Sequence, residues 1–238
     1  MNFLEEGLAK LNFSKNQIER IAPLMENYAD EILLFNGAYN LVNASSRDEI
    51  FVRHILDTLS AAQEIFRIAE KISAESAQSA QSQSENAKKN EPKEITIADI
   101  GSGGGLPGIP LAAAFPQFNF VLVERMSKRC AFLENVRALL GLENVRIENS
   151  ELEKIPHESF EIATFRAFRP LEKKMLSNLL AVLKKGGSLA AYKAKRKNIV
   201  EEMRLADCSS YNIIALDVPF LTDVSAEEHE RNLVLIEK

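Results

Sequence analysis

The chain has 238 residues, of which 46% are hydrophobic. This length is sufficient for one α/β domain with a modest extension and too short for two large enzyme domains. A formal net charge of -5 excludes a protein that coats nucleic acid non-specifically, because such binding needs many lysine and arginine contacts to phosphates. No apolar run approaches the roughly 18 residues that span a bilayer, and the first residues are not a basic and then apolar leader, so we expect a cytoplasmic protein without membrane segments.

The cysteines of the chain predict neither a metal site nor a disulfide framework. Cys130 and Cys208 are far apart in the sequence, and no histidines accompany them at the spacing of zinc ligands. Both side chains are expected to be buried thiols, and we expect no bound metal.

Residues 1–72 predict a helical N-terminal extension. Ser14 and Gln17 form a capping-box pattern, and the apolar residues between Ile18 and Phe35 recur at steps of three and four, which places them on one helix face. Pro23 should bend this helix without ending it.

A second amphipathic stretch at residues 50–66 completes the extension, and the composition then changes abruptly. Residues 73–94 are built mainly from Ser, Ala, Gln, Asn, Glu and Lys, with almost nothing apolar to bury. This segment predicts a mobile loop or a frayed helix without a catalytic role.

Residues 95–238 predict one α/β domain. Short apolar runs typical of strands alternate with helical stretches, which is the pattern of parallel βαβ units with helices on both faces of a sheet. The expected strands are residues 95–100, 118–123, 145–148, 160–165 and 188–193, and the expected helices are residues 108–115, 128–140 and 171–183. Gly141 and Gly186 are expected at helix C-termini. Two further strands, at residues 211–218 and 232–236, have no helix between them, so the sheet should finish with an antiparallel pair.

The most informative segment is the glycine-rich run DIGSGGGLPG, from Asp99 to Gly108, directly after the first expected strand. Glycines permit a tight turn and the close approach of a ligand to the backbone, and the helix that follows offers unpaired N–H groups. Asp99, Gly101, Gly103 and Gly105 match the acidic-x-Gly-x-Gly-x-Gly pattern of methyltransferases that use S-adenosylmethionine.

Two classes of ligand compete for this loop. Gly103, Gly105 and Gly108 also fit the G-x-G-x-x-G pattern of dinucleotide enzymes, which leaves an NAD-linked oxidoreductase as the alternative. A carboxylate at Asp99 suits a cofactor that carries an ammonium and a sulfonium and opposes a pyrophosphate, which favours S-adenosylmethionine. Glu124, at the end of the second expected strand, can accept hydrogen bonds from both ribose hydroxyls of an adenosine in either class, unless it is a plain surface glutamate.

Polar residues outside the loop are candidates for the substrate side. Arg166 and Lys193 each stand near the carboxyl end of an expected strand, on the ligand side of the sheet, and are predicted to orient the cofactor or RNA phosphates. Salt bridges at the edge of the core are the alternative for both. His54 and Asp57 are three residues apart on a helix, where they either pair with each other or line an RNA-facing wall.

A basic run extends from Lys184 to Lys197 without an acidic residue between its ends. Because the net charge of the chain is negative, any RNA contact must be a local patch of this kind. A solvated charged turn is the alternative interpretation.

In several segments the chain resembles the ribosomal RNA small subunit methyltransferase G family, also called glucose-inhibited division protein B, and the resemblance covers nearly its whole length. The Leu-Pro-Gly after the glycines and the later Arg-Ala are the most specific matches. The matching segments are Tyr39-Asn40-Leu41, Arg53-His54 with Asp57-Thr58, residues 97–110, Lys128-Arg129 with Phe132-Leu133, Leu142 with Asn144-Val145, Arg166-Ala167-Phe168, and Lys193.

This resemblance implies a Rossmann-like class I methyltransferase fold, with a mostly parallel seven-stranded sheet whose last strand is antiparallel, and a helical N-terminal extension. The implied reaction is methylation of guanine N7 in 16S ribosomal RNA, with S-adenosyl-L-methionine as cofactor and 16S RNA or the small ribosomal subunit as partner. By the same resemblance Gly101 and Leu106 should line the cofactor site, Leu152 and Glu153 should flank the adenine, and Arg166 should lie at the cofactor pocket. We expect a monomer.

The chemistry of guanine N7 needs no catalytic base. The N7 atom carries an in-plane lone pair, so methyl transfer from a sulfonium removes no proton, and the enzyme has to align the N7 atom, the methyl carbon and the sulfur. We therefore expect no catalytic side chain. A catalytically silent RNA-binding module that keeps the fold is the remaining alternative, against which the intact glycine loop argues.

Overall fold

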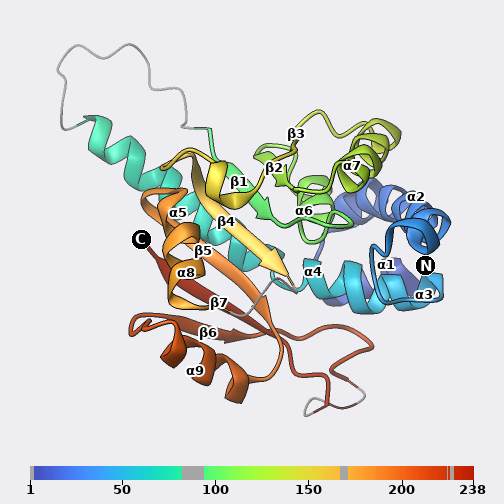
Figure 1. The fold of residues 1–238 in the computed structure, drawn as a ribbon. Helices are drawn as coiled ribbons and strands as arrows, with labels where there is room; N and C mark the ends of the chain where they lie inside the picture. Colours follow the sequence, from blue (N-terminus) through green and yellow to red (C-terminus); the bar gives the residue numbers. More distant parts are fainter. Residues whose placement is uncertain (1–2, 82–93, 167–170, 224, 226–227) are drawn as a thin grey trace.

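A mixed β-sheet forms the centre of the protein (Figure 1). The computed structural model describes residues 3–81, 94–166, 171–223, 225 and 228–238, and within them the sheet has seven strands in the order β3-β2-β1-β4-β5-β7-β6. The strands are β1 Thr96–Ile100, β2 Asn119–Val123, β3 Val145–Glu148, β4 Phe160–Arg166, β5 Leu183–Lys193, β6 Asn212–Ala215 and β7 Asn232–Glu237. Strands β1 to β5 are parallel, and β7 is antiparallel to both β5 and β6. The expected mostly parallel sheet with an antiparallel last strand is confirmed.

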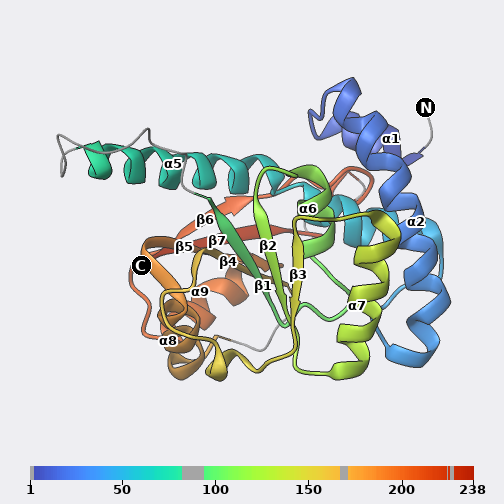
Figure 2. The same cartoon turned by 90° about the horizontal axis from the view of Figure 1, so that it is seen from above.

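Helices cover both faces of this sheet, because alternate side chains of a strand point to opposite sides. In β1, Ile97 belongs to one apolar core and Ala98 to the other. The helices α5 (Ala62–Gln81), α6 (Gly108–Ala114) and α7 (Ser127–Leu140) pack on the face of Ile97, and α8 (Lys173–Ala181) and α9 (Arg196–Leu205) pack on the opposite face (Figure 2). No helix among the described residues has both the length and the apolar character needed to cross a membrane.

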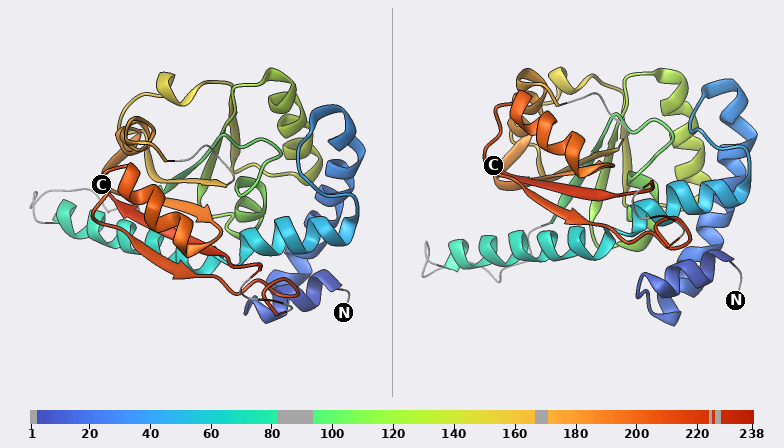
Figure 3. Two further views of the ribbon diagram at one scale, coloured as in Figure 1. Left: turned by 60° about the horizontal axis from the view of Figure 1, so that its bottom comes forward. Right: turned by 90° about the horizontal axis from the view of Figure 1, so that it is seen from below.

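The N-terminal extension packs against the first face and shares its core. Its elements are α1 (Phe3–Lys10), α2 (Lys15–Tyr39), α3 (Arg47–Ile50), the π-helical turn η1 (Phe51–Leu56) and α4 (Asp57–Leu59). The predicted capping box is confirmed, since Ser14 N–H donates to Gln17 Oε1 (2.9 Å) and α2 continues past Pro23. Helix α2 contacts α6 and α7, so the extension lies on the side of the molecule away from α8 and α9 (Figure 3).

Helix α5 is longer than the composition predicts. It continues through Gln81, so the first part of the polar segment at residues 73–94 is helical, as in the frayed-helix interpretation. Residues 82–93 lie outside the described residues. The buried side of α5, which includes Ile65, Ile68 and Ile72, explains why the helix forms beside the sheet.

The two expected helix-ending glycines have different outcomes. Gly141 ends α7 in the left-handed conformation, as predicted (φ 63°). The prediction for Gly186 is wrong, because α8 ends at Ala181 and Gly186 (φ 76°) lies inside β5. The pairing of β5 with β4 shifts register in this region, which requires a backbone that glycine adopts readily.

Strand β5 divides the basic run between Lys184 and Lys197. Lys184 near the beginning of the strand pairs with Glu161 (Nζ to Oε1, 2.7 Å), whereas Lys193 ends the strand. The regularly paired part of β5, from Ser188 to Lys193, spans roughly 17 Å, and Lys184 and Lys193 line different pockets, so the two ends of the run do not form one patch. The prediction of a single patch or turn is therefore wrong.

Helix α9, which begins at Arg196, was not predicted. Of its ten residues only Ile199 and Met203 are buried, so only two apolar residues of the sequence show the spacing of a buried helix face. Such a pattern is too weak to distinguish a helix from a polar loop.

Replacing glycine by alanine at two positions should change the stability of the fold in opposite directions. In Gly37→Ala the new Cβ meets nothing within 4 Å in helix α2, so the free energy of unfolding should rise by about 0.5–1 kcal/mol. In Gly108→Ala the Cβ would collide with Leu122 Cδ2 and the Asp99 carboxylate, which should cost about 1–3 kcal/mol. Urea denaturation of both variants measures the difference, and equal stability would contradict the close packing of α6 on the sheet.

Candidate active site

The glycine loop lies where β1 ends and is fastened to the end of β2. The N–H groups of Gly101 and Ser102 both donate to the carbonyl of Val123 (2.8 and 3.1 Å). Gly101, Gly103 and Gly105 have φ values of 70°, 60° and 95°, which side-chain-bearing residues rarely adopt. The loop geometry therefore depends on glycine at these three positions.

The carboxylate of Asp99 binds the glycine loop at two points. Its Oδ2 atom accepts hydrogen bonds from Ser102 Oγ (2.6 Å) and from the N–H of Gly108 (3.0 Å), which joins the loop to the start of α6. The side chain is fully buried, and burial raises the pKa of the Asp99 carboxyl to about 6. Its Oδ1 atom has no hydrogen-bond partner among the described residues. Asp99 thus fixes the shape of the loop and does not line the pocket beside it.

Glu124 holds the loop from the side of β2. Its Oε2 atom accepts from the N–H of Gly103 (2.9 Å), and its Oε1 atom accepts from the N–H of Met126 (2.8 Å). Each carboxylate oxygen still has capacity for a further hydrogen bond. The backbone carbonyl of Glu124 is also bonded, by Asn149 Nδ2 (3.0 Å) and the Ser150 N–H (3.1 Å), so the residue is fixed in place.

A pocket of about 490 Å³ opens beside this loop. Among the predicted cofactor residues it brings together Gly101, Glu124, Leu152 and Glu153. Its apolar wall suits an adenine ring, and its carboxylates suit ribose hydroxyls and an ammonium group but not a pyrophosphate. The unpartnered, buried Oδ1 atom of Asp99 adds one more acceptor near the loop. The residues present therefore fit S-adenosylmethionine.

The remaining predicted cofactor residues, including the buried Asp99, do not line this pocket. A Cβ on Gly105 would stand 2.6 Å from Ile109 Cγ1, so this glycine faces the core, and Leu106 is buried there as well. Gly103 contributes its N–H to Glu124. Arg166 lines a neighbouring pocket instead.

This second pocket, of about 420 Å³, lies at the same edge of the sheet. Strand β4 pairs Asp99 with Thr164, so the end of β4 at Arg166 lies next to the glycine loop. The lining residues come from the ends of β4, β5 and β6, the start of β7 and the extension: Asn43, Arg53, His54, Asp57, Arg166, Tyr192, Lys193, Ala194, Leu216, Arg231 and Asn232. All four predicted substrate residues meet here.

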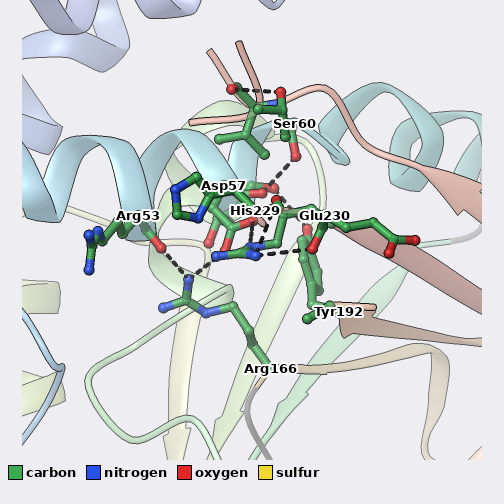
Figure 4. A network of polar contacts seen from close by, with 12 residues as sticks. Arg53, Asp57, Ser60, Arg166, Tyr192, His229 and Glu230 are labelled. Atoms are coloured by element: carbon green, nitrogen blue, oxygen red, sulfur yellow. Dashed lines mark hydrogen bonds and ion pairs between the residues drawn. The ribbon is translucent and has the colours of Figure 1, made fainter. Parts of the chain in front are cut away.

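Asp57 binds two arginines among the residues that line the second pocket, and Figure 4 shows it beside one of them, Arg166. Its Oδ2 atom lies 2.9 Å from Arg166 Nη1 and its Oδ1 atom lies 3.4 Å from Arg231 Nε. Arg166 Nη1 also donates to the carbonyl of Arg53 (3.1 Å). Burial raises the pKa of the Asp57 carboxyl although both guanidinium groups oppose this shift, so desolvation outweighs the attraction. The ion pair therefore fixes the position of Arg166 more than it stabilises the fold.

His54 is kept neutral by its burial and, to a smaller extent, by the same arginine. Arg166 Nη2 lies 2.7 Å from His54 Nδ1. Since a guanidinium group has donors but no acceptor, Arg166 is the donor and Nδ1 the acceptor. The hydrogen of the neutral imidazole ring is therefore on Nε2. Burial and, next, the charge of Arg166 lower the pKa of His54 to about 3. His54 and Asp57 were predicted to pair or to line a wall: they line the second pocket, and each contacts Arg166.

Lys193 has a partner within the chain too. Its Nζ atom lies 2.6 Å from Glu202 Oε1 and 5.2 Å from the centroid of the Phe165 ring. Arg166 and Lys193 thus make the salt bridges of the alternative interpretation while they line the second pocket.

Sequence reasoning missed three residues at this edge. Arg231 binds Asp57, and its position just before the last expected strand was the available signal. Tyr192 Oη donates to the carbonyl of Thr58 (2.9 Å), and Tyr28 Oη donates to the carbonyl of Gly104 (2.5 Å). Tyr28 was predicted only as part of an apolar helix face, because nothing in the periodicity reveals where a hydroxyl points.

The fold and the loop define a class of enzyme. A seven-stranded sheet with an antiparallel β7, a glycine loop after β1 and an acidic residue after β2 are the features of a Rossmann-like class I S-adenosylmethionine-dependent methyltransferase. The rRNA small subunit methyltransferase G family matches residues 75–234, and the chain belongs to this family. The cofactor of the family is S-adenosylmethionine.

Curated relatives carry the same family name over nearly the full length. The ribosomal RNA small subunit methyltransferase G of Treponema denticola is 38% identical over 243 residues, which cover 99% of this chain and 93% of the relative. That of Treponema pallidum (strain Nichols) is 36% identical and covers 92% of this chain and 88% of the relative. Among solved structures, a SAM-dependent methyltransferase from Aquifex aeolicus has a TM-score of 0.46 and 17% identity, over 60% of this chain and 82% of that one.

The low pKa of His54 predicts an acid-sensitive contribution to stability. The unfolded chain takes up a proton at this side chain below its ordinary pKa of 6.5, whereas the folded protein does so only near pH 3. The free energy of unfolding should therefore fall as the pH drops below 6.5. Between pH 7 and pH 5 the wild type should lose on the order of 2 kcal/mol more than His54→Gln.

Urea denaturation at the two pH values measures this difference. His157→Gln, a substitution at an exposed position, is the control and should behave as the wild type does. Equal losses in the wild type and in His54→Gln would contradict the neutral state of His54.

Proposed function

We propose that the protein transfers a methyl group from S-adenosylmethionine to the N7 atom of a guanine in 16S ribosomal RNA. The observation that carries the proposal is the adjacency of two pockets at one edge of the sheet, one with the carboxylates of an adenosine site and the other lined by basic residues. The family and the printed names of its members, which specify the small-subunit ribosomal RNA, support the choice of acceptor.

The chemistry of this transfer is compatible with the residues of the second pocket. When bound, S-adenosylmethionine supplies an electrophilic methyl carbon, to which the N7 lone pair bonds while the electrons of the carbon–sulfur bond remain on sulfur. No proton leaves the guanine, so no side chain has to accept one. His54 and Asp57 are both bonded to Arg166 and are suited to positioning.

Each predicted site residue then has a proposed role. On the cofactor side, Glu124 accepts hydrogen bonds from the ribose hydroxyls, and Leu152 and Glu153 flank the adenine. Asp99, which is buried outside the lining of the pocket, fixes the loop and attracts the ammonium group through its charge. This division leaves the first pocket to the donor.

On the acceptor side, Arg166 and Lys193 orient the RNA, and His54 and Asp57 keep Arg166 in place. The target guanine has to be unpaired or splayed out, since side chains cannot read the deep major groove of an A-form helix. We propose that the protein acts as a monomer in the cytoplasm, on 16S RNA or on the assembled small subunit.

Transfer of a labelled methyl group tests this function. Small subunits from cells that lack the protein are incubated with the purified enzyme and S-adenosylmethionine labelled in the methyl group, and the RNA is mapped by mass. We expect label at N7 of one guanine in 16S RNA. Glu124→Gln should lower the affinity for the cofactor at least about tenfold, because it weakens charge-assisted hydrogen bonds, whereas Glu148→Gln outside the pocket should not.

Two results would point to the alternatives. Calorimetric binding of NAD without binding of S-adenosylmethionine would favour an oxidoreductase. RNA binding without any label transfer would favour a catalytically silent module. Label on another base or on another RNA would remove the substrate but keep the cofactor.

A further inference from the structure

We propose that Tyr28 of the N-terminal extension is a positioning residue for the cofactor loop, which makes the extension a structural part of the cofactor site. The inference rests on the proposed function in one respect, namely that the glycine loop binds an adenosyl cofactor. It goes beyond that function because it assigns to the extension a role towards the cofactor as well as the RNA.

The hydroxyl of Tyr28 is bonded directly to the loop. Tyr28 lies in α2, is fully buried, and donates from Oη to the carbonyl of Gly104 (2.5 Å). A Cβ added to Gly105 would lie only 3.0 Å from the hydroxyl oxygen of Tyr28. The tyrosine therefore contacts two consecutive residues of the loop, and neither Tyr28 nor these two glycines line the cofactor pocket.

The chain that follows α2 adds two further contacts to this support. A Cβ on Gly104 would lie 3.2 Å from Leu41 Cβ, so Leu41 packs against the loop. Arg129, which lines the cofactor pocket, donates from Nη2 to the carbonyl of Asn40 (3.0 Å). The Asn36 side chain holds this segment by accepting from the N–H groups of Leu41 (2.9 Å) and Val42 (3.0 Å).

The loop is thus held from two directions. Glu124 accepts from the N–H of Gly103 on the pocket side, and Tyr28 donates to the carbonyl of Gly104 on the core side. Glycine backbone has many accessible conformations, so its position depends on such bonds. Without the Tyr28 hydroxyl the buried Gly104 carbonyl loses its donor, and cofactor binding would have to order the loop at a cost in affinity.

A second buried tyrosine provides a matched control. Tyr192 Oη also donates to a backbone carbonyl across the boundary between the extension and the sheet, but its acceptor is Thr58, which is not part of the glycine loop. Because Tyr192 lines the second pocket, the Tyr192→Phe variant is a control for the affinity for the cofactor and not for the transfer reaction. Tyr28→Phe and Tyr192→Phe each remove one buried hydroxyl and should lower the melting temperature to a similar extent. Only Tyr28→Phe should lower the affinity for the cofactor.

The experiment measures binding of S-adenosylhomocysteine to the full-length protein by calorimetry. We expect Tyr28→Phe to weaken binding about tenfold and to raise the KM for S-adenosylmethionine with little change in kcat at saturation. Tyr192→Phe should keep the affinity within about twofold of wild type. Amide hydrogen exchange at residues 102–105 should become faster in Tyr28→Phe alone.

The outcomes separate this inference from the proposed function. If the wild type does not bind S-adenosylhomocysteine, both are wrong. If the wild type binds and Tyr28→Phe binds equally well, or if both variants lose the same affinity, the positioning role alone is wrong. Should Tyr28→Phe fail to fold, Leu41→Gly removes the Cβ that packs against Gly104 and so tests the support of the loop by the extension. Unchanged affinity for S-adenosylhomocysteine in that variant would also overturn the inference.

Discussion

The cofactor site depends on one constraint: a loop made largely of glycine has to be held in a single conformation. Three of its glycines have positive φ angles, so the loop follows a path closed to other residues. Its shape is set by hydrogen bonds to the surrounding chain. Asp99 accepts from the N–H of Gly108, Glu124 accepts from the N–H of Gly103, and Tyr28 donates to the carbonyl of Gly104. Two of these groups belong to the sheet and one to the extension, so the cofactor site and the extension form one unit.

The proposed acceptor pocket is likewise formed jointly by the sheet and the extension. Arg166 projects from the end of β4, but its orientation is determined by Asp57 and His54 of the extension and by the carbonyl of Arg53. Because desolvation of Asp57 exceeds the attraction of its partners, the network contributes geometry more than stability. The two pockets are neighbours since β1 and β4 are adjacent in the sheet, and this adjacency is what a direct transfer between two bound molecules requires.

The sheet and the glycine loop could be predicted because their signals are local. Short apolar runs between helical stretches identify the strands, and Asp99 with its glycines identifies the loop before any contact is known. Gly186 could not be placed, because a glycine after a helical stretch looks alike whether it ends the helix or permits a register shift. The partners of Arg166 and Tyr28 escaped prediction for a different reason: they are more than 70 residues away in the chain, and only folding brings them together.

A crystal structure of the protein with S-adenosylhomocysteine provides the most direct measurement. We expect the ribose hydroxyls on Glu124, the adenine beside Leu152, and the sulfur directed towards the pocket of Arg166. Density for the ligand elsewhere, or a sulfur atom turned away from Arg166, would contradict a transfer between the two pockets.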